Sequence, residues 1–178
     1  MQKRKIALSL LAATLLAGCG YDPAVSTISI GKDGNVDSYI VEEFTASYYD
    51  AEELRNTVME DIQQANNELK QTAIALDSYE LTEEGVLKAT VTYENAVAYE
   101  TFNKETLYVG LWKDTLAKGY TVKADMKDEE YHVVVFSEPV NVKVPKNILY
   151  VSEGLQLEGK KTVTVTDKEK DIYYIIYE

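Results

Sequence analysis

One amphipathic helical segment lies between two β-hairpin patterns in the first half of this 178-residue chain. Its apolar side chains recur every three or four residues, which places them along one face of a helix of about five turns. Asp50 precedes the segment and Glu53 follows three residues later, an arrangement that caps the first turn of a helix. The apolar stripe consists of Leu54, Val58, Ile62, Ala65 and Leu69. A helix in this position has to pack against a sheet, so an α+β fold is predicted.

The two hairpins are predicted from their turns and from their alternating apolar residues. Thr27–Ile30 and Val36–Phe44 flank a turn that contains Gly34, and glycine accepts the positive φ of a tight turn. Ile74–Leu81 and Val86–Tyr93 flank the second turn. The return strand of this second hairpin alternates apolar and polar residues, which is typical of a sheet with one face in water.

The last third of the chain is predicted to consist of β-strands. Tyr131–Phe136 and Ile172–Tyr177 are apolar on both faces, which predicts central strands that are covered on each side. Pro139 and Pro145 bracket Val140–Val144, which predicts that this strand lies at an edge of the sheet or forms a short arm.

The segments between the second hairpin and these strands are less regular. Asn95 is expected to cap a two-turn helix, and Leu107–Trp112 fits either a strand or a buried loop. Thr121–Glu130 is polar and acidic and is predicted to be a surface loop. Residues 27–178 are therefore predicted to form a single α+β domain. It consists of a hairpin, a helix and a hairpin followed by a β-rich C-terminal half, with the long helix packed on one face of an antiparallel sheet.

The chain begins with a cationic and apolar leader that ends at its only cysteine. Residues 3–5 are basic, and residues 6–18 form a run of 13 without a charge. That run is shorter than the ~20 residues that cross a bilayer as a helix. The small side chains at Ala17 and Gly18 make the peptide bond before Cys19 accessible to a signal peptidase. The leader is therefore interpreted as an export signal, with a buried structural cysteine as the alternative.

The four residues Leu16-Ala17-Gly18-Cys19 resemble the lipobox of bacterial lipoproteins. The resemblance implies a signal peptide over residues 1–18, cleavage between Gly18 and Cys19, and a diacylglycerol of the palmitate type on the Cys19 thiol. Residues 19–26 are then a lipidated N-terminus with a short tether. The resemblance places the domain at the cell membrane, on its extracytoplasmic face.

The acidic charge of the chain limits its partners. The formal net charge is −12, and residues 1–18 hold three basic and no acidic residues, so residues 19–178 have a net charge of −15. Nucleic acid is excluded as a partner, because proteins that bind it need a basic surface. With Cys19 acylated no thiol is left for a disulfide, so the domain is expected to depend on core packing.

Residues of catalytic type are few. His132 is the only histidine, and it lies in an apolar strand, where an imidazole is more often packed than catalytic. One histidine and one cysteine do not make the usual zinc ligand set, so no metal and no cofactor are predicted. The alternation from Asp33 to Asp37 resembles the start of a calcium loop. However, Ser38 and Phe44 stand where that loop needs glycine and glutamate, and a hairpin turn is favoured.

Tyrosine is the one residue type in clear excess, with fourteen in the chain. Tyrosine suits glycan stacking and protein interfaces, but it also favours β-strands, and the strand interpretation is preferred for most of them. The candidate binding surface consists of Tyr48, Tyr49, Tyr108, Trp112 and Tyr120.

Two segments, Tyr99–Tyr120 and Glu138–Ser152, resemble uncharacterised lipoproteins of Gram-positive anaerobes. No activity is assigned to that group, so the resemblance implies no functional residues. The hypothesis that follows is a non-catalytic binding or accessory module for a protein or cell-wall partner. The alternative is a hydrolase of cell-wall glycan that uses aspartate and glutamate alone, which requires two carboxylates facing each other across a cleft. A solute-binding component of a transporter is disfavoured, because such components usually have two lobes.

Overall fold

The computed structural model describes residues 22–44, 50–122, 124, 126 and 130–178, which form two α-helices, two 3-10 turns and eleven strands. The helices are α1 (Ala51–Leu69) and α2 (Ala96–Asn103), and the 3-10 turns are η1 (Trp112–Asp114) and η2 (Leu116–Lys118). The strands are β1 (Thr27–Ile30), β2 (Val36–Glu43), β3 (Ile74–Leu81), β4 (Val86–Tyr93), β5 (Leu107–Leu111), β6 (His132–Phe136), β7 (Asn141–Lys143), β8 (Ile148–Val151), β9 (Leu155–Glu158), β10 (Thr162–Val165) and β11 (Tyr173–Tyr177). The prediction of a mixed α and β fold dominated by antiparallel sheet is confirmed.

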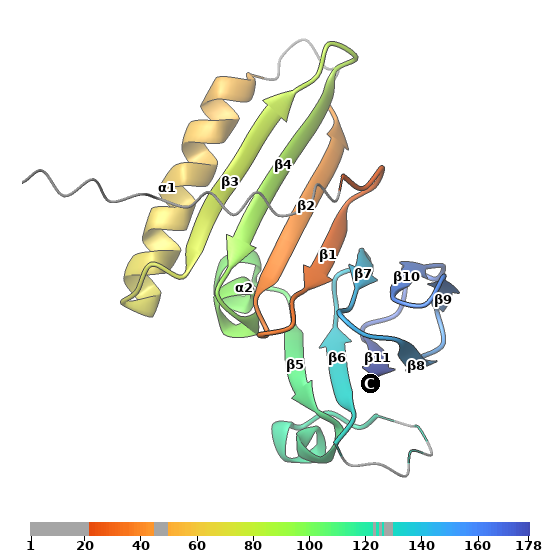
Figure 1. Cartoon of the computed structure of the whole chain (residues 1–178). Helices are drawn as coiled ribbons and strands as arrows, with labels where there is room; N and C mark the ends of the chain where they lie inside the picture. The colour runs from red at the N-terminus through yellow and green to blue at the C-terminus, as the bar shows by residue number, and fades with distance from the viewer. Residues whose placement is uncertain (1–21, 45–49, 123, 125, 127–129) are drawn as a thin grey trace, which may run out of the picture.

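The strands form two sheets, whereas the sequence predicted one (Figure 1). The larger sheet has seven strands in the order β3-β4-β2-β1-β7-β10-β9, and the smaller has four in the order β5-β6-β11-β8. Among the described strands, β1 with β7 is the one parallel pair. Alternation of apolar and polar residues shows which side chains share a face, but it does not identify the partner strand, so the division into two sheets is not visible in it.

Local capping and turn interactions begin and end the elements of the first half. One carboxylate oxygen of Asp50, Oδ1, accepts hydrogen bonds from the amides of Glu52 and Glu53 at 2.9 and 3.1 Å and starts α1. The side chain of Asn95 accepts one from the amide of Ala98 at 3.0 Å and starts α2. Gly34 has a φ of 83°, as the turn between β1 and β2 requires.

The position of β7 corrects the prediction that Val140–Val144 lies at an edge. β7 is an interior strand, paired with β1 on one side and with β10 on the other. Pro139 and Pro145 lie outside its three residues, so neither proline removes an amide from the ladder. The prolines limit the length of the strand and not its place in the sheet.

The four-stranded sheet has apolar side chains on both faces, and β6 and β11 are its central strands, as predicted. One face belongs to the main core through Val134, Phe136 and Ile175. The other face is a smaller apolar cluster built on Val133, Val135 and Ile176, and its partly buried members are Tyr108, Trp112, Tyr120, Val122, Ala124, Met126, Tyr131 and Tyr174. The prediction of a surface loop over Thr121–Glu130 is therefore wrong for Val122, Ala124 and Met126. Their every-second-residue spacing brings them onto the sheet.

Helix α2 lies where the two sheets meet (Figure 1). Tyr99 on this helix is almost fully buried, its ring packs edge-on against Tyr93 at 5.1 Å between centroids, and its hydroxyl donates a hydrogen bond to the carboxylate of Glu138. Burial, with the nearby Glu138 carboxylate, raises the pKa of Tyr99 far above its ordinary value. The hydroxyl therefore stays protonated, and it joins α2 to the segment that leads from β6 to β7.

Replacing Tyr99 by phenylalanine removes this bond and keeps the ring. A hydrogen bond to a charged group contributes about 1.5–3 kcal/mol, so Tyr99→Phe is expected to lower the free energy of unfolding by that amount. Urea denaturation followed by circular dichroism measures the change. Tyr150→Phe, at the exposed edge strand β8, is the control and is expected to stay within about 0.5 kcal/mol of the parent. Equal effects of the two substitutions would contradict this role for the hydroxyl.

Candidate functional site

The predicted site residues separate into two groups. Gly18, Cys19, Tyr48 and Tyr49 lie outside the described residues. Tyr108, Trp112 and Tyr120 lie together on the outer face of the four-stranded sheet, as partly buried members of its smaller cluster. Their side chains pack on Val133, Val135 and Ile176, so they help to cover this sheet.

Tyr108 and Tyr120 contact each other at 5.4 Å between ring centroids. Burial is the largest cause that raises the pKa of each of these tyrosines. Gly110, two residues after Tyr108 on the same face of β5, leaves the room that this ring fills, since a Cβ there would lie 2.3 Å from the Tyr108 hydroxyl oxygen. The tyrosine rings therefore have a packing role that accounts for their position.

His132 is also packed. Its ring stacks on Tyr177 across the β6–β11 pair, with 5.2 Å between centroids. Within the part of the chain that the structure describes, no group of three or more histidine, cysteine, aspartate or glutamate side chains could hold a metal ion.

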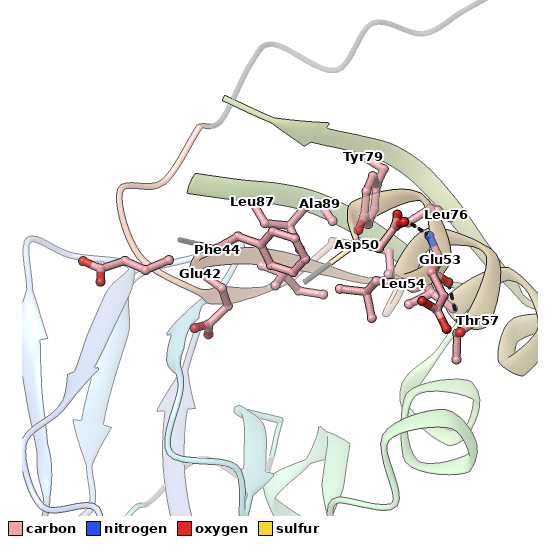
Figure 2. Close-up of a pocket in the computed structure, with 14 residues that line it drawn as sticks. Glu42, Phe44, Asp50, Glu53, Leu54, Thr57, Leu76, Tyr79, Leu87 and Ala89 are labelled. Carbon is pink, nitrogen blue, oxygen red and sulfur yellow. Dashed lines mark hydrogen bonds between the residues drawn. The ribbon is translucent and has the colours of Figure 1, made fainter. Parts of the chain in front are cut away.

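A cleft lies between the N-terminal half of α1 and the face of the β2–β4–β3 sheet region (Figure 2). Its volume is about 640 Å³, within the range of ~300–1,000 Å³ that is usual for ligand sites. The apolar lining consists of Ile40, Phe44, Leu54, Val58, Leu76, Tyr79, Leu87, Ala89 and Val91, and the polar lining consists of Glu42, Glu43, Asp50, Glu53 and Thr57. We call this site the α1 cleft.

The α1 cleft exists because the two halves of α1 pack differently. Ile62 and Ala65, in the second half, are each 6% exposed and belong to the main core. Leu54, in the first half, is 36% exposed although it lies on the same helical stripe. The spacing of the stripe predicts which side chains share a face of the helix, and the structure shows that this face is buried in the second half of α1 and more exposed at Leu54.

Polar contacts hold α1 to β3 at both ends of the helix. The side-chain Nδ2 of Asn66 donates a hydrogen bond to the carbonyl oxygen of Ile74. Its Oδ1 accepts hydrogen bonds from the backbone amides of Ala73 and Ile74, and all three bonds are 2.9 Å long. At the other end the Tyr79 hydroxyl donates to the carbonyl oxygen of Ala51 at 2.8 Å. Burial raises the pKa of Tyr79, which keeps this donor protonated at neutral pH. The first turns of α1 are therefore fixed in place above the cleft without filling it.

Acidic groups lie at both ends of the apolar floor. In Figure 2, Glu42 lies on one side of Phe44, and Asp50 and Glu53 lie on the other. The ion pairs found among the described side chains involve other acidic residues, so no lysine or arginine neutralises Glu42, Glu43 or Glu53. The α1 cleft therefore presents an apolar middle with negative ends.

This arrangement does not match the pair of facing carboxylates that glycan hydrolysis needs. Asp50 is engaged as the cap of α1, and Glu42 lies beyond Phe44 from it (Figure 2).

A scan against protein-family models finds no match, and searches of curated proteins and of solved structures find no similar chain. Among the described residues, no helix is long and apolar enough to cross a membrane.

The Asn66 side chain is predicted to be the main attachment of α1 to β3. Asn66→Ala leaves the amides of Ala73 and Ile74 without this acceptor and is expected to cost about 1–3 kcal/mol of unfolding free energy. Asn67→Ala, the next residue on the same helix with an exposed side chain, is the matched control and is expected to change stability by less than about 0.5 kcal/mol. Urea denaturation of both variants measures the difference, and similar losses would show that the attachment is not specific to Asn66.

Proposed function

We propose that this protein is a lipid-anchored, extracytoplasmic binding module, without catalytic activity, that uses the α1 cleft to bind a peptide segment of a partner protein. The observation behind the proposal is the combination of an apolar middle with carboxylates at both ends of the cleft, of which Glu42, Glu43 and Glu53 have no ion-pair partner among the described residues. In this proposal the hairpin–helix–hairpin half, with α1 laid over one face of β2–β4, is the binding unit.

The charge of the cleft favours one class of segment. Apolar side chains of a ligand gain about 25 cal/mol for each Å² that they remove from water in the apolar middle. Lysine or arginine side chains on either side of them would lie near Glu42, Glu43 and Glu53, which have no cationic partner among the described residues. The overall net charge of −12 adds long-range attraction for a cationic segment. The ligand class is therefore an apolar peptide segment flanked by basic residues.

The anchor part of the proposal is tested in a bacterial host. The parent chain is expected to incorporate labelled palmitate and to remain with the membrane fraction, because two or more acyl chains give stable attachment. Cys19→Ser removes the only thiol of the chain and is expected to lose the label and move the protein to the soluble fraction. A Cys19→Ser protein that stays with the membrane would contradict the lipid anchor.

The cleft part is tested with purified protein and two fluorescent peptides, in which a run of leucines is flanked on both sides by lysines or by glutamates. Anisotropy titration is expected to show binding of the lysine peptide only. Leu54→Gln puts a polar group in the apolar middle and is expected to weaken binding roughly tenfold, which corresponds to about 1.4 kcal/mol. Leu116→Gln, at a position in η2 that is 76% exposed and outside the cleft, is the matched control.

Charge at the ends of the cleft is tested separately. Glu53→Gln is expected to weaken binding of the lysine peptide and to reduce its dependence on salt, because one exposed attraction is removed. Glu60→Gln, exposed on the same helix but outside the cleft lining, is expected to have little effect. Equal binding of the glutamate peptide, or release of sugar from cell-wall glycan by the purified protein, would overturn the proposed function.

A further inference from the structure

The strands beneath the α1 cleft have a second, opposite face. Side chains alternate along a strand, so Leu87 and Val91 of β4 line the cleft while Lys88 and Thr90 point to the other side. On that other side a groove of about 250 Å³ is lined by Tyr39, Lys88 and Thr90 and by the N-terminal residues Asp22 and Pro23. We call this side of β2–β4 the tether face, and residues 22–26 the tether.

The tether is held to the tether face at two points. The Ser26 hydroxyl donates to the carbonyl oxygen of Val41 at 3.1 Å and accepts from the Val41 amide at 2.9 Å. Four residues earlier, the ammonium group of Lys88 contacts both carboxylate oxygens of Asp22 at 2.9 Å. The chain therefore reaches β1 by crossing the tether face.

The position of Asp22 limits the position of Cys19. The sequence places three peptide units between the two residues, and a peptide unit spans at most 3.80 Å between Cα atoms, so a lipid attached at Cys19 would have at most roughly 11 Å of chain between it and Asp22. A lipid on Cys19 would therefore hold the bilayer surface close to the tether face. The α1 cleft lies beyond the sheet from that point.

We propose that the tether face is the membrane-proximal side of the domain and that the α1 cleft opens away from the bilayer. The inference rests on the proposed lipidation of Cys19. It places the partner segment in the space outside the membrane, where a peptide can reach the cleft without passing between the domain and the lipid.

The charges of the tether face indicate that the tether, and not lipid attraction, sets this orientation. Lys88 is accompanied there by three acidic residues that line the grooves on this side and not the α1 cleft, which are Asp22, Glu80 and Glu84. Such a face is not attracted to anionic phospholipid. The orientation is therefore expected in vesicles of neutral lipid, where only the attachment point and the tether act.

In the test, a protein that begins at Cys19 is coupled through its only thiol to a maleimide lipid. The vesicles consist of phosphatidylcholine and also contain a dansyl-labelled lipid. All described elements lie from residue 22 onward, so this chain keeps the whole described fold. In a Trp112→Phe background, Thr90→Trp reports from the tether face and Thr57→Trp from the rim of the cleft. Energy transfer to the dansyl groups is expected to be roughly twofold higher from Thr90→Trp, because the sheet and helix layers that separate the two positions are about 10 Å apart.

Equal transfer from the two positions, or higher transfer from Thr57→Trp, would overturn the orientation. Lys88→Gln releases Asp22 and is expected to reduce the difference between the positions, whereas Lys118→Gln, in η2, is expected to preserve it. Circular dichroism checks that each variant is folded.

A second measurement uses the parent sequence and needs no tryptophan change. Hydroxyl-radical footprinting is expected to show that attachment to vesicles protects Tyr39, on the tether face, and leaves Tyr79, in the cleft, unchanged. Protection of Tyr79 alone would overturn the orientation. Because the coupling is chemical, both results are independent of lipidation in cells. Failure of the Cys19→Ser experiment and failure of this inference are therefore distinguishable.

Discussion

Strand β1 joins the two halves of this protein, and the rest of the structure depends on its being paired along both edges. It pairs antiparallel with β2 and parallel with β7, so the strands that precede β5 in the larger sheet continue directly into the strands that follow β6. A four-residue strand supplies few hydrogen bonds, and its stability comes largely from Ile28 and Ile30, which are buried in the main core with Val142 of β7. The same strand begins at Thr27, directly after the tether, so the tether and the centre of the larger sheet are neighbours.

The α1 cleft shows how a folded domain keeps apolar surface accessible. Hydrogen bonds of Asn66 and Tyr79 hold the two ends of α1 to β3 and its preceding residue. The first turn of the helix is held by the hydrogen bond from the Tyr79 hydroxyl rather than by close packing. Exposed apolar surface of this kind favours self-association. The carboxylates at the ends of the cleft and the net charge of −12 oppose it, because a second copy of the chain approaches with the same sign of charge.

The sequence predicts the elements whose signals are local, and it fails where the answer depends on distant partners. Asp50, Asn95 and Gly34 act on residues within one turn, so the starts of both helices and the first turn were predictable. β6 and β11 were predictable as central strands because their own side chains are apolar on both faces. The interior place of β7 depends on β1 and β10, and nothing in Asn141–Lys143 specifies those partners. The α1 cleft was not predicted for the same reason: Leu54 continues the apolar stripe, and its exposure depends on how α1 packs against distant strands of the sheet.

The parallel pairing of β1 with β7 also fixes an order of events in time. During synthesis β1 leaves the ribosome before the other strands, whereas β7 follows only after both helices and the next five strands. Until then one edge of β1 has no partner, and a contact so distant along the chain closes slowly because the entropy of the large loop must first be overcome. The N-terminal strand is thus made first but gains its second partner only after β7 is made, and the larger sheet stays divided until most of the chain has emerged.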